Sequence, residues 1–564
     1  MPPIERFHRQ LSTILKFYIY SVYAILSNMN MTDTAHTADK ALTHIGNLIT
    51  RLREDRGMSQ EALAKKIGTT QSVVARIEKG EQNLSTETLS KISAALDHEI
   101  VSIARGGTVN FRITGGRKLS GRIAVRTSKN GAVGILCASL LNKGVTTVRN
   151  VPRIEEVNRL IEVLESIGVK ISWKESTDKS GAGKDRFDLE IKPPAKFTLN
   201  KINYESAAKT RSCIIMIGGL VHQLNSFKFP QAGGCRLGSR TVKPYFYALE
   251  KLGIGIETTS KYYEVSRSTS RANAFGKIFG DSRPNEIILY EAGDTVTETV
   301  LIAAAGVPGT TVIKFASANY QVQDVCFYLQ KLGVKIEGIG TSRLTVHGVA
   351  DINMPVEYFL SEDPIEAMSL LAAAIVTKSE ITVERCPIDF LELELLKLEK
   401  MGFKYSIVKR YKAENGETNL VDIRTKPSKL VALEEKIHAQ PYPGINMDNL
   451  PFFAVIGTQA EGQTFIHDWT YEERAIYYKE LDKLRAETIL ADPHRFYVTG
   501  PTKLKATEVV CPPALRPSVI ILIAMLAAEG VSVLRNVYNI NRGYEDLAER
   551  LNKIGAKIET FRDL

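Results

Sequence analysis

The sequence predicts a small all-helical module followed by a large α/β domain built from repeats. Residues 41–104 are dense in helix-forming and helix-capping patterns, and one helix–glycine–strand pattern recurs six times after residue 108. Solenoids and propellers also produce repeats. The alternation of helices with short runs rich in Val, Ile and Thr favours α/β (α+β) units over both.

Composition indicates a globular protein of more than one domain. The 564 residues are 44% hydrophobic and 24% charged, which is ordinary for folded chains. None of the six cysteines lies in a CxxC pair, so neither a zinc site nor a redox motif is indicated. Free thiols of this kind are typical of a reducing compartment, and we expect a cytoplasmic protein. The net charge of +10 suits binding to polyanions, although general solubility explains it equally well.

The first 40 residues have no clear place in either domain. Residues 11–26 are apolar, but Lys16 interrupts them and they are too short for a membrane span. We interpret residues 1–40 as poorly ordered or mis-started, with Met29 or Met31 as the translation start. The alternative is a weakly membrane-associating helix. We expect no stable membrane insertion.

The helical module shows two short helices joined by a tight turn. Ser59 is placed to cap a helix over 60–67, and Gly68 provides the turn. Thr70 or Gln71 then opens a helix that runs to about Glu78. The stretch MSQEALAKKIGTTQSVVARIEKG resembles the Xre-type helix-turn-helix, in which the second helix enters the major groove of DNA.

This resemblance implies that residues 41–104 bind DNA. The second helix would face the bases, Val73, Val74 and Ile77 would face the core, and Gln60 would hold a phosphate. A dimer is implied, because such modules usually bind palindromes. The alternative is a bundle used for dimerisation or for contact with the following domain, to which 105–107 form a very short linker. The candidate DNA-binding residues are Gln60, Thr70, Gln71, Ser72 and Arg76.

The six repeats are marked by the residue that ends one helix in each. These positions are separated by about 70 to 85 residues and precede a β-like run. They are Gly168, Gly253, Gly333, Gly402, Arg485 and Gly555. The second repeat is longer than its neighbours and contains PQAGGCRLGSR. Long irregular loops tend to be lids or binding loops, so this insertion is a candidate functional segment.

Four stretches of the large domain resemble UDP-N-acetylglucosamine 1-carboxyvinyltransferases. They are SGRIAVRTSKNGAVGILCASLL, PQAGGCRLGSRTVKPYFYALEKLG, PYPGINMDNLPFFA and YNINRGYEDLAERLNKIGAKIE. The resemblance implies a two-domain inside-out α/β barrel of six βαβαββ-like repeats with the active site between the domains. Residues 129–349 would form one domain, with repeats 1–3 and the Cys235 loop. Residues 108–128 plus 350–564 would form the other, with repeats 4–6.

The implied reaction moves the enolpyruvyl group of phosphoenolpyruvate to a sugar hydroxyl and releases phosphate. It needs an acid for the methylene carbon, a base for the hydroxyl and cations for the phosphate and carboxylate. By resemblance Cys235 is the acid, Asp448 is the base and Lys129 contacts phosphoenolpyruvate. The alternatives are a free cysteine and a capping aspartate. Substrate-binding residues implied in the same way are Lys129, Asn130, Arg211, Arg240, Gly293, Asp294, Thr295, Asp448, Thr470, Arg516 and Arg542.

The sequence departs from the family at several of these places, which leaves a second class of function open. The departures are Asn319, Gln321, Pro364, Met447, Ala514 and Asn539. They favour slower chemistry, a different acceptor or a domain that only senses a UDP-sugar or phosphoenolpyruvate for the DNA-binding module. A sensor needs no acid and base together, so Cys235 with Asp448 favours an enzyme. The Cys235 loop favours the UDP-sugar enzyme over the one acting on shikimate 3-phosphate. No metal or cofactor is indicated.

Overall fold

The structure is a computed structural model that describes residues 46, 49–50, 53–54, 58–82, 88, 91–92, 95–96, 108–176, 186–231, 233, 241–267 and 285–562. The chain divides into two compact units, residues 1–107 and residues 108–563. Residues 1–40, the linker 105–107, Cys235 and Arg240 lie outside the described part, so the expectations for them are not addressed by it.

The first unit contains the predicted pair of short helices. These are α3 (Gln60–Ile67) and α4 (Gln71–Glu78). The hydroxyl of Ser59 accepts a hydrogen bond from the Ala62 amide, and Gly68 takes the left-handed conformation that ends α3. Leu63, Val74 and Ile77 are buried in one apolar cluster, together with Ile49 from the preceding helical segment. The helix, turn and helix are therefore confirmed.

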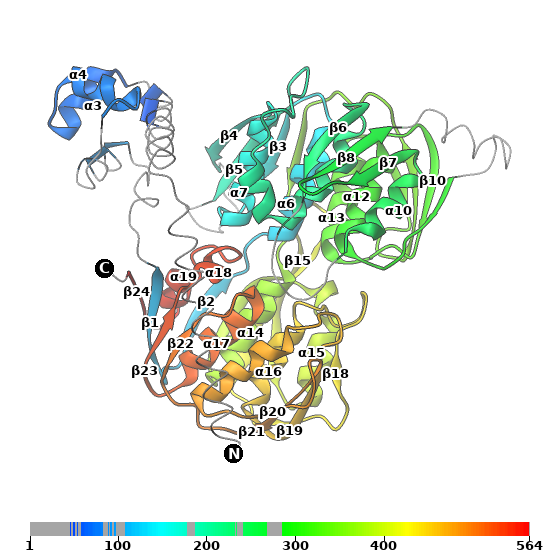
Figure 1. The fold of residues 1–564 in the computed structure, drawn as a ribbon. Helices are drawn as coiled ribbons and strands as arrows, with labels where there is room; N and C mark the ends of the chain where they lie inside the picture. The colour runs from blue at the N-terminus through cyan, green and yellow to red at the C-terminus, as the bar shows by residue number, and fades with distance from the viewer. Residues whose placement is uncertain are drawn as a thin grey trace, which may run out of the picture. The chain divides into compact units, whose positions relative to one another are not determined.

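The described part of the second unit contains six separate sheets, one for each predicted repeat. The plan is plainest in residues 285–348, where one continuous segment supplies all four strands of a sheet; Figure 1 labels α12, β10 and α13 of this segment. The first strand lies parallel to the second, and the last two are antiparallel additions on the other side. The elements are β9 (Asn285–Ile288), α12 (Asp294–Ala305), β10 (Gly309–Lys314), α13 (Tyr320–Lys331), β11 (Lys335–Glu337) and β12 (Arg343–Gly348).

The two earlier repeats vary this plan. Among its described residues the second has a three-stranded sheet without the first strand, and three short helical pieces replace one buried helix. The first comprises α6 (Lys129–Ala138), η2 (Ser139–Leu141), β3 (Thr146–Arg149), α7 (Glu155–Ser166), β4 (Lys170–Glu175) and β5 (Phe187–Lys192). The second comprises α8 (Tyr204–Lys209), η3 (Arg211–Ile215), α9 (Met216–Leu220), β6 (Ser226–Pro230), α10 (Lys243–Glu250), β7 (Ile254–Thr258) and β8 (Tyr262–Arg267).

The fourth repeat follows the plan, and the fifth replaces the outer α-helix with a 3-10 helix. The fourth comprises β2 (Ser120–Ala124), α14 (Pro364–Val376), β14 (Glu380–Pro387), η4 (Ile388–Phe390), α15 (Glu392–Lys400), β15 (Lys404–Lys412) and β16 (Asn419–Lys426). The fifth comprises β17 (Leu430–Val431), β18 (Ile437–His438), α16 (Leu450–Gly457), β19 (Ala460–His467), η5 (Ala475–Leu484), β20 (Glu487–Leu490) and β21 (Arg495–Gly500).

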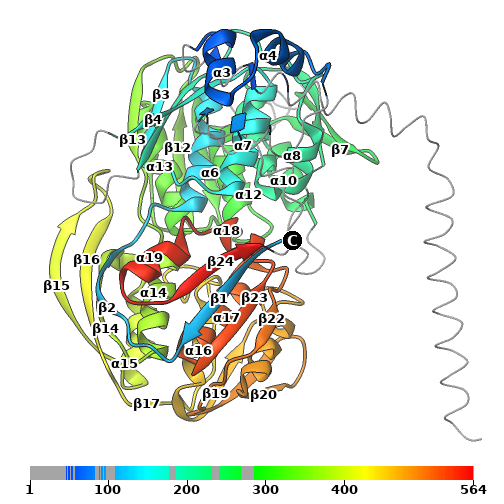
Figure 2. The same ribbon diagram turned by 90° about the vertical axis from the view of Figure 1, so that its left-hand side faces the viewer.

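The sixth repeat is completed by a strand from the start of the unit. β1 (Val109–Gly115) lies between β23 and β24, which Figure 2 shows side by side with it. The other elements are β22 (Glu508–Val510), α17 (Leu515–Ala527), β23 (Gly530–Arg535), α18 (Tyr538–Asn541), α19 (Leu547–Lys553) and β24 (Ile558–Arg562).

We call residues 129–359 the first lobe, and residues 109–124 with 364–562 the second lobe. β13 (Val356–Phe359) pairs in parallel with β3, so this strand belongs to a sheet of the first lobe. The domain boundary predicted from sequence, between residues 349 and 350, had placed this strand in the other domain, with residues 350–564. The connecting segments 125–128 and 360–363 run beside each other, with the Ser128 amide bonded to the Ser361 carbonyl at 2.7 Å.

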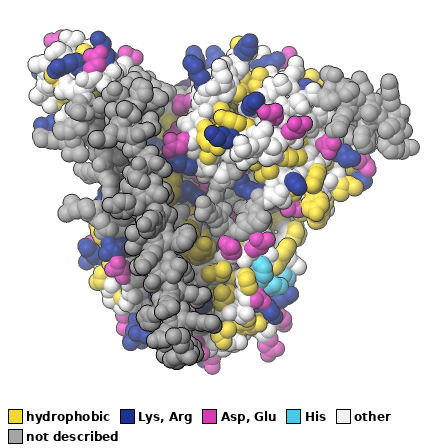
Figure 3. Space-filling model, viewed as in Figure 1, with side chains coloured by type: hydrophobic (Ala, Val, Ile, Leu, Met, Phe, Trp, Pro, Cys, Tyr) yellow, Lys and Arg dark blue, Asp and Glu magenta, His cyan; other side chains and the backbone are white. Residues whose placement is uncertain are grey.

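Each lobe encloses apolar helices. Every residue of α14 and of α16 is buried, and both contact α17 in the second lobe (Figure 1). Helices that are apolar on all sides are stable only when protein surrounds them, which explains why the sheets lie outside. Among the described residues no helix is both long and apolar enough to cross a bilayer. On the face shown in Figure 3, acidic and basic side chains are interspersed over the second unit.

Candidate functional site

Asp448 lies in a turn between β18 and α16. The amide of Asp448 donates to Oδ1 of Asn446 at 2.8 Å, which fixes the turn. Its carboxylate accepts from Nε and Nη2 of Arg516, both at 3.2 Å, and lies 3.6 Å from Nη1 of Arg474. Burial raises the pKa of Asp448, but Arg516, Arg474 and Lys129 outweigh it and leave that pKa below its usual value. This carboxyl is therefore ionised at neutral pH.

Arg474 is a site residue that the sequence reasoning missed. It is 1% exposed, and Asp468 binds it through two contacts of 2.6 and 2.8 Å. Its guanidinium also lies 4.3 Å from the centre of the Tyr471 ring. A paired and stacked arginine holds its position well. The signal available in the sequence was TYEERA, where this arginine follows the Thr470–Tyr471 pair that we had singled out.

Arg516 is the second residue of α17, a helix that is buried from Leu515 to Leu526. It is 5% exposed and donates to the Tyr544 hydroxyl at 2.9 Å, in addition to Asp448. Ala514 is the N-cap residue and offers no side-chain acceptor to the helix. The side-chain amide of Asn539 donates to the Pro512 carbonyl at 2.9 Å. Asn539 therefore lies close to Ala514, so two of the departures from the family pattern are neighbours in the second lobe.

Lys129 and Asn130 open α6 in the first lobe. Nζ of Lys129 lies 3.0 Å from Glu156, a residue of α7. Arg542, from the second lobe, approaches the same Glu156 oxygen at 3.8 Å through Nε. Burial raises the pKa of Glu156, but Lys129 and Arg542 lower it further than burial raises it. Glu156, also missed from sequence, therefore links cations of both lobes.

Asp294 begins α12 in the first lobe and faces Ser317 and Asn319. Its carboxylate accepts from Oγ of Ser317 at 2.5 Å and from Nδ2 of Asn319 at 3.1 Å. Burial raises the pKa of Asp294, and these hydrogen bonds only partly offset that effect. The next residue, Thr295, shares a short hydrogen bond with the Tyr245 hydroxyl, and Gly293 precedes the helix as its N-cap.

The remaining predicted residues lie in different surroundings. Asn130 donates to the Tyr320 hydroxyl at 2.9 Å and to Gln321 at 3.2 Å. Arg211 donates to the Thr241 carbonyl at 3.2 Å, at the end of the segment that contains Cys235. The hydroxyl oxygen of Thr470 is buried and makes no hydrogen bond. Nε of Arg542 is also buried without a hydrogen bond, and its contact is the ion pair with Glu156.

The structure does not describe Cys235 or Arg240, although it places the flanking Gly233. A Cβ added at Gly233 would lie 1.4 Å from the Ala208 carbonyl oxygen, so only glycine fits there. The five described cysteines are buried. Burial raises the pKa of Cys511 to about 11, so this thiol is not a reactive one.

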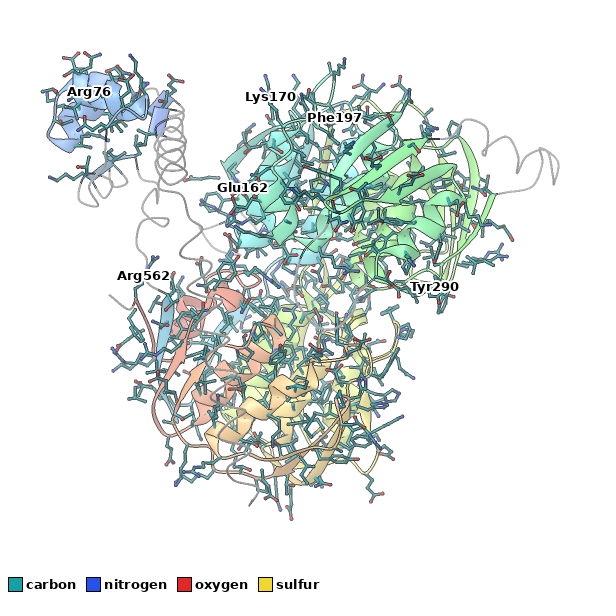
Figure 4. The ribbon with its side chains drawn as sticks, in the orientation of Figure 1. Arg76, Glu162, Lys170, Phe197, Tyr290 and Arg562 are labelled. Atoms are coloured by element: carbon teal, nitrogen blue, oxygen red, sulfur yellow. The ribbon has the colours of Figure 1, made fainter. Side chains whose placement is uncertain are left out.

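The exposed face of α4 carries the residues predicted to meet DNA. Thr70, Gln71, Ser72 and Arg76 are exposed, and Figure 4 labels Arg76 on this module. Gln71 donates to the Gln60 side chain at 3.1 Å, and Gln60 donates to Glu78 at 2.8 Å. Glu78 in turn forms a buried ion pair with Arg53 at 2.6 Å. The sequence analysis did not identify this pair, which anchors α4.

Two lobes of three similar sheets, with cations and carboxylates facing one another at their junction, define the enolpyruvyl transferase class. The sequence of residues 113–551 matches the family described as EPSP synthase (3-phosphoshikimate 1-carboxyvinyltransferase), and residues 49–100 match the family described as Helix-turn-helix. The chain belongs to the carboxyvinyltransferase family.

Similar curated proteins carry a more specific name. A UDP-N-acetylglucosamine 1-carboxyvinyltransferase of Treponema denticola is 32% identical over 453 residues, which cover 80% of this chain and 98% of that protein. One from Bacteroides thetaiotaomicron is 30% identical over 459 residues, with 80% and 99% covered. The recognition from sequence is confirmed for both units.

Solved structures confirm the fold class. The enolpyruvyl transferase NikO from Streptomyces tendae superposes with a TM-score of 0.67 at 21% identity, covering 81% of this chain and all of that one. An EPSP synthase from Acinetobacter baumannii superposes with a TM-score of 0.61 at 16% identity, with 80% of this chain covered.

Proposed function

We propose that residues 108–564 transfer the enolpyruvyl group of phosphoenolpyruvate to the 3-hydroxyl of UDP-N-acetylglucosamine, the first committed step of peptidoglycan precursor synthesis. The observation that carries this proposal is the ionised Asp448 beside Arg516 and Arg474, with Lys129 facing it from the other lobe. An ionised carboxylate can take a hydroxyl proton, and fixed cations can hold a phosphate and a carboxylate.

The roles follow from what the step demands. Cys235 donates a proton to the methylene carbon while the sugar oxygen bonds to the neighbouring carbon and loses its proton to Asp448. Breaking of the bond to phosphate and loss of the added proton restore the double bond. Lys129, Arg516 and Arg542 balance the charge of phosphoenolpyruvate, and Asn130 positions it. Gly293, Asp294, Thr295, Arg211, Arg240 and Thr470 are assigned to the two substrates.

Phosphate release with both substrates tests this proposal. We expect release that requires the UDP-sugar and that Cys235→Ala and Asp448→Ala each abolish. Cys511→Ala and Asp492→Ala serve as controls, because the Cys511 thiol is buried with a raised pKa and the partly exposed Asp492 carboxylate pairs with Arg495. Saturable binding of the UDP-sugar without any release would refute the enzyme and favour a sensor.

We propose that the first unit binds DNA as a dimer through α4. Support comes from the exposed Gln71 and Arg76 on a helix whose other face is buried. An amide suits adenine and a guanidinium suits guanine or phosphate. Mobility shifts with selected duplexes test this, and binding must weaken steeply with salt if phosphates are contacted. Both activities place the protein in the cytoplasm.

A further inference from the structure

Three side chains form a hydrogen-bonded chain between the lobes. Nδ2 of Asn446, in the second lobe, donates to Oδ1 of Asn319, in the first, at 3.1 Å. Nδ2 of Asn319 donates to Oδ2 of Asp294 at 3.1 Å. At the other end, Oδ1 of Asn446 accepts from the amide of Asp448 at 2.8 Å. The chain therefore starts at the backbone of Asp448 and ends at a carboxylate on the opposite lobe.

The direction of the bonds in this chain is fixed by two backbone amides. The backbone amide of Asp448 can only donate, so it must meet the oxygen of Asn446. The backbone amide of Tyr320 can also only donate, so it must meet Oδ1 of Asn319, which directs the NH₂ group of Asn319 toward Asp294. The amide groups of Asn446 and Asn319 then have one arrangement that satisfies both contacts. Hydrogen bonds aligned in this way strengthen one another inside a protein.

The turn that carries Asp448 is tied down on its own lobe as well. The amide of Asn446 donates to Oε1 of Glu394 at 3.0 Å, and Asn449 donates to the same oxygen at 2.9 Å. Asn319 is 9% exposed and also caps α13 through the Tyr320 amide at 2.9 Å. Both partners of the bridge are thus rigid, so the contact fixes the distance between the turn and the first lobe.

We infer that Asn446 is a positioning residue, which sets Asp448 in register with the first lobe through Asn319 and Asp294. This inference rests on the proposed function, because a base on one lobe must meet an acceptor and a phosphate held partly by Lys129 on the other. A misplacement of about 1 Å is enough to slow such a step strongly. Asn446 itself is not among the residues assigned to substrate, and it acts through the backbone of Asp448.

Two variants separate the bridge from the local turn. Asn446→Ser keeps an oxygen that can accept from the Asp448 amide but cannot reach Asn319. Asn319→Ser keeps a cap for α13 and likewise cannot reach Asn446. Asn552→Ser is the matched control, because among the described contacts the side chain of Asn552 bonds only to Ile558, within the second lobe.

The first measurement is hydrogen exchange in the full-length protein, which needs no turnover. Asn319→Ser should speed exchange of amides 446–450, on the opposite lobe, about threefold to tenfold, the range that loss of one hydrogen bond produces. Exchange in α14 and in the body of α13 should stay unchanged. Unchanged exchange at 446–450, with α13 intact, would overturn the inference whether or not the protein is an enzyme.

The second measurement is turnover of the same variants. Both Asn446→Ser and Asn319→Ser should lower kcat about tenfold or more, with less than a threefold change in the KM of either substrate. The double variant should lose no more than the worse single variant, because the two share one bridge. Additive losses would overturn the inference. Absence of turnover in the unsubstituted protein would refute the proposed function and leave the exchange result standing.

Discussion

Arg516 donates two hydrogen bonds, from Nε and Nη2, to the same oxygen of Asp448, each at 3.2 Å. The same guanidinium donates to the Tyr544 hydroxyl at 2.9 Å. The arginine is thus oriented from two sides, and it acts on Asp448 both by position and by charge. Since the carboxylate is proposed as the base, its neighbour determines the pH at which the base becomes available.

Replacing Arg516 with Gln should move the acidic limb of the pH profile to higher pH. Arg516 is among the cations that hold the pKa of Asp448 below its usual value against the effect of burial. Without it that pKa rises, so the base is lost to protonation earlier as the pH falls. The profile of kcat/KM reports this pKa for the free enzyme. The absolute rate will also fall, but the position of the limb is diagnostic.

Arg516→Lys is the control for charge, because it keeps a cation and loses the forked geometry. Its acidic limb should stay closer to that of the unsubstituted protein. Identical limbs in all three proteins would show that Asp448 is not the group whose ionisation limits the rate at low pH.

Asp324 should make the second unit less stable as the pH rises from about 4 to about 6. Burial raises its pKa to about 6, although hydrogen bonds from Tyr358 and Ser361 oppose that effect. A folded-state pKa above the unfolded value means that the folded state holds the proton longer. The stability that protonated Asp324 contributes is therefore complete below its pKa in the unfolded chain. That stability is lost as the pH rises through its pKa of about 6 in the folded protein.

Asp324→Asn should remove this dependence, so that between pH 4 and pH 8 the variant gains stability relative to the unsubstituted protein, on the order of 3 kcal/mol. Urea unfolding followed by tryptophan fluorescence measures it, because both tryptophans, Trp173 and Trp469, lie in the second unit. Asp351→Asn, at an exposed carboxyl, is the control and should follow the unsubstituted curve. Parallel curves for Asp324→Asn would contradict the prediction.

Arg485 occupies a position where the other five repeats have glycine. Its φ of 69° is left-handed, like the φ of 86° at Gly333. A side chain in this conformation costs about 1 kcal/mol. Arg485→Gly should therefore raise the free energy of unfolding by about 1 kcal/mol, as read from the urea midpoint.

Gly333→Ala is the matched opposite change. A Cβ at Gly333 would meet nothing within 4 Å, so only backbone strain is added, and about 1 kcal/mol of stability should be lost. If Arg485→Gly proved destabilising instead, the arginine side chain would have to make a contact that outweighs its strain.

The sequence was informative where local chemistry decides the structure. The left-handed helix ends at Gly168, Gly253 and Gly402 were predictable because glycine alone adopts that conformation without cost, and they revealed the repeats. The caps and turn of α3 and α4 were predictable for the same reason. In contrast, the 3-10 form of η5 and the shortened sheet of the second repeat have no such local signal.

Pairings between distant segments were not predictable from the residues themselves. β13 joins β3 although more than two hundred positions separate them, and Glu156 meets Arg542 only because the lobes face each other. Arg474 and Asn446 were also missed, since an arginine in a polar stretch and an asparagine in a turn usually lie in solvent. Their roles depend on the fold around them.

Arg76 and Glu78 lie on the same helix, but substitution of Glu78 should unfold the module, whereas substitution of Arg76 should weaken only its binding to DNA. Arg76 is exposed, whereas Glu78 is buried and accepts from Arg53 at 2.6 and 3.1 Å and from Gln60 at 2.8 Å. Glu78→Ala would leave the Arg53 cation buried without its partner, which costs about 3 to 5 kcal/mol. A small module has little stability to spare, so it should unfold, as hydrogen exchange over 58–82 would show.

Arg76→Ala should leave that exchange unchanged and weaken binding to a selected duplex by about 1 to 3 kcal/mol, if the guanidinium meets a base. Arg76→Lys keeps the charge and loses the fork, so it should recover affinity for non-specific DNA and little of the preference for the selected site. Equal loss on both kinds of DNA would instead assign Arg76 to a phosphate. In that case Arg76→Ala would make the slope of log affinity against log salt concentration shallower by about one, the value of one phosphate contact.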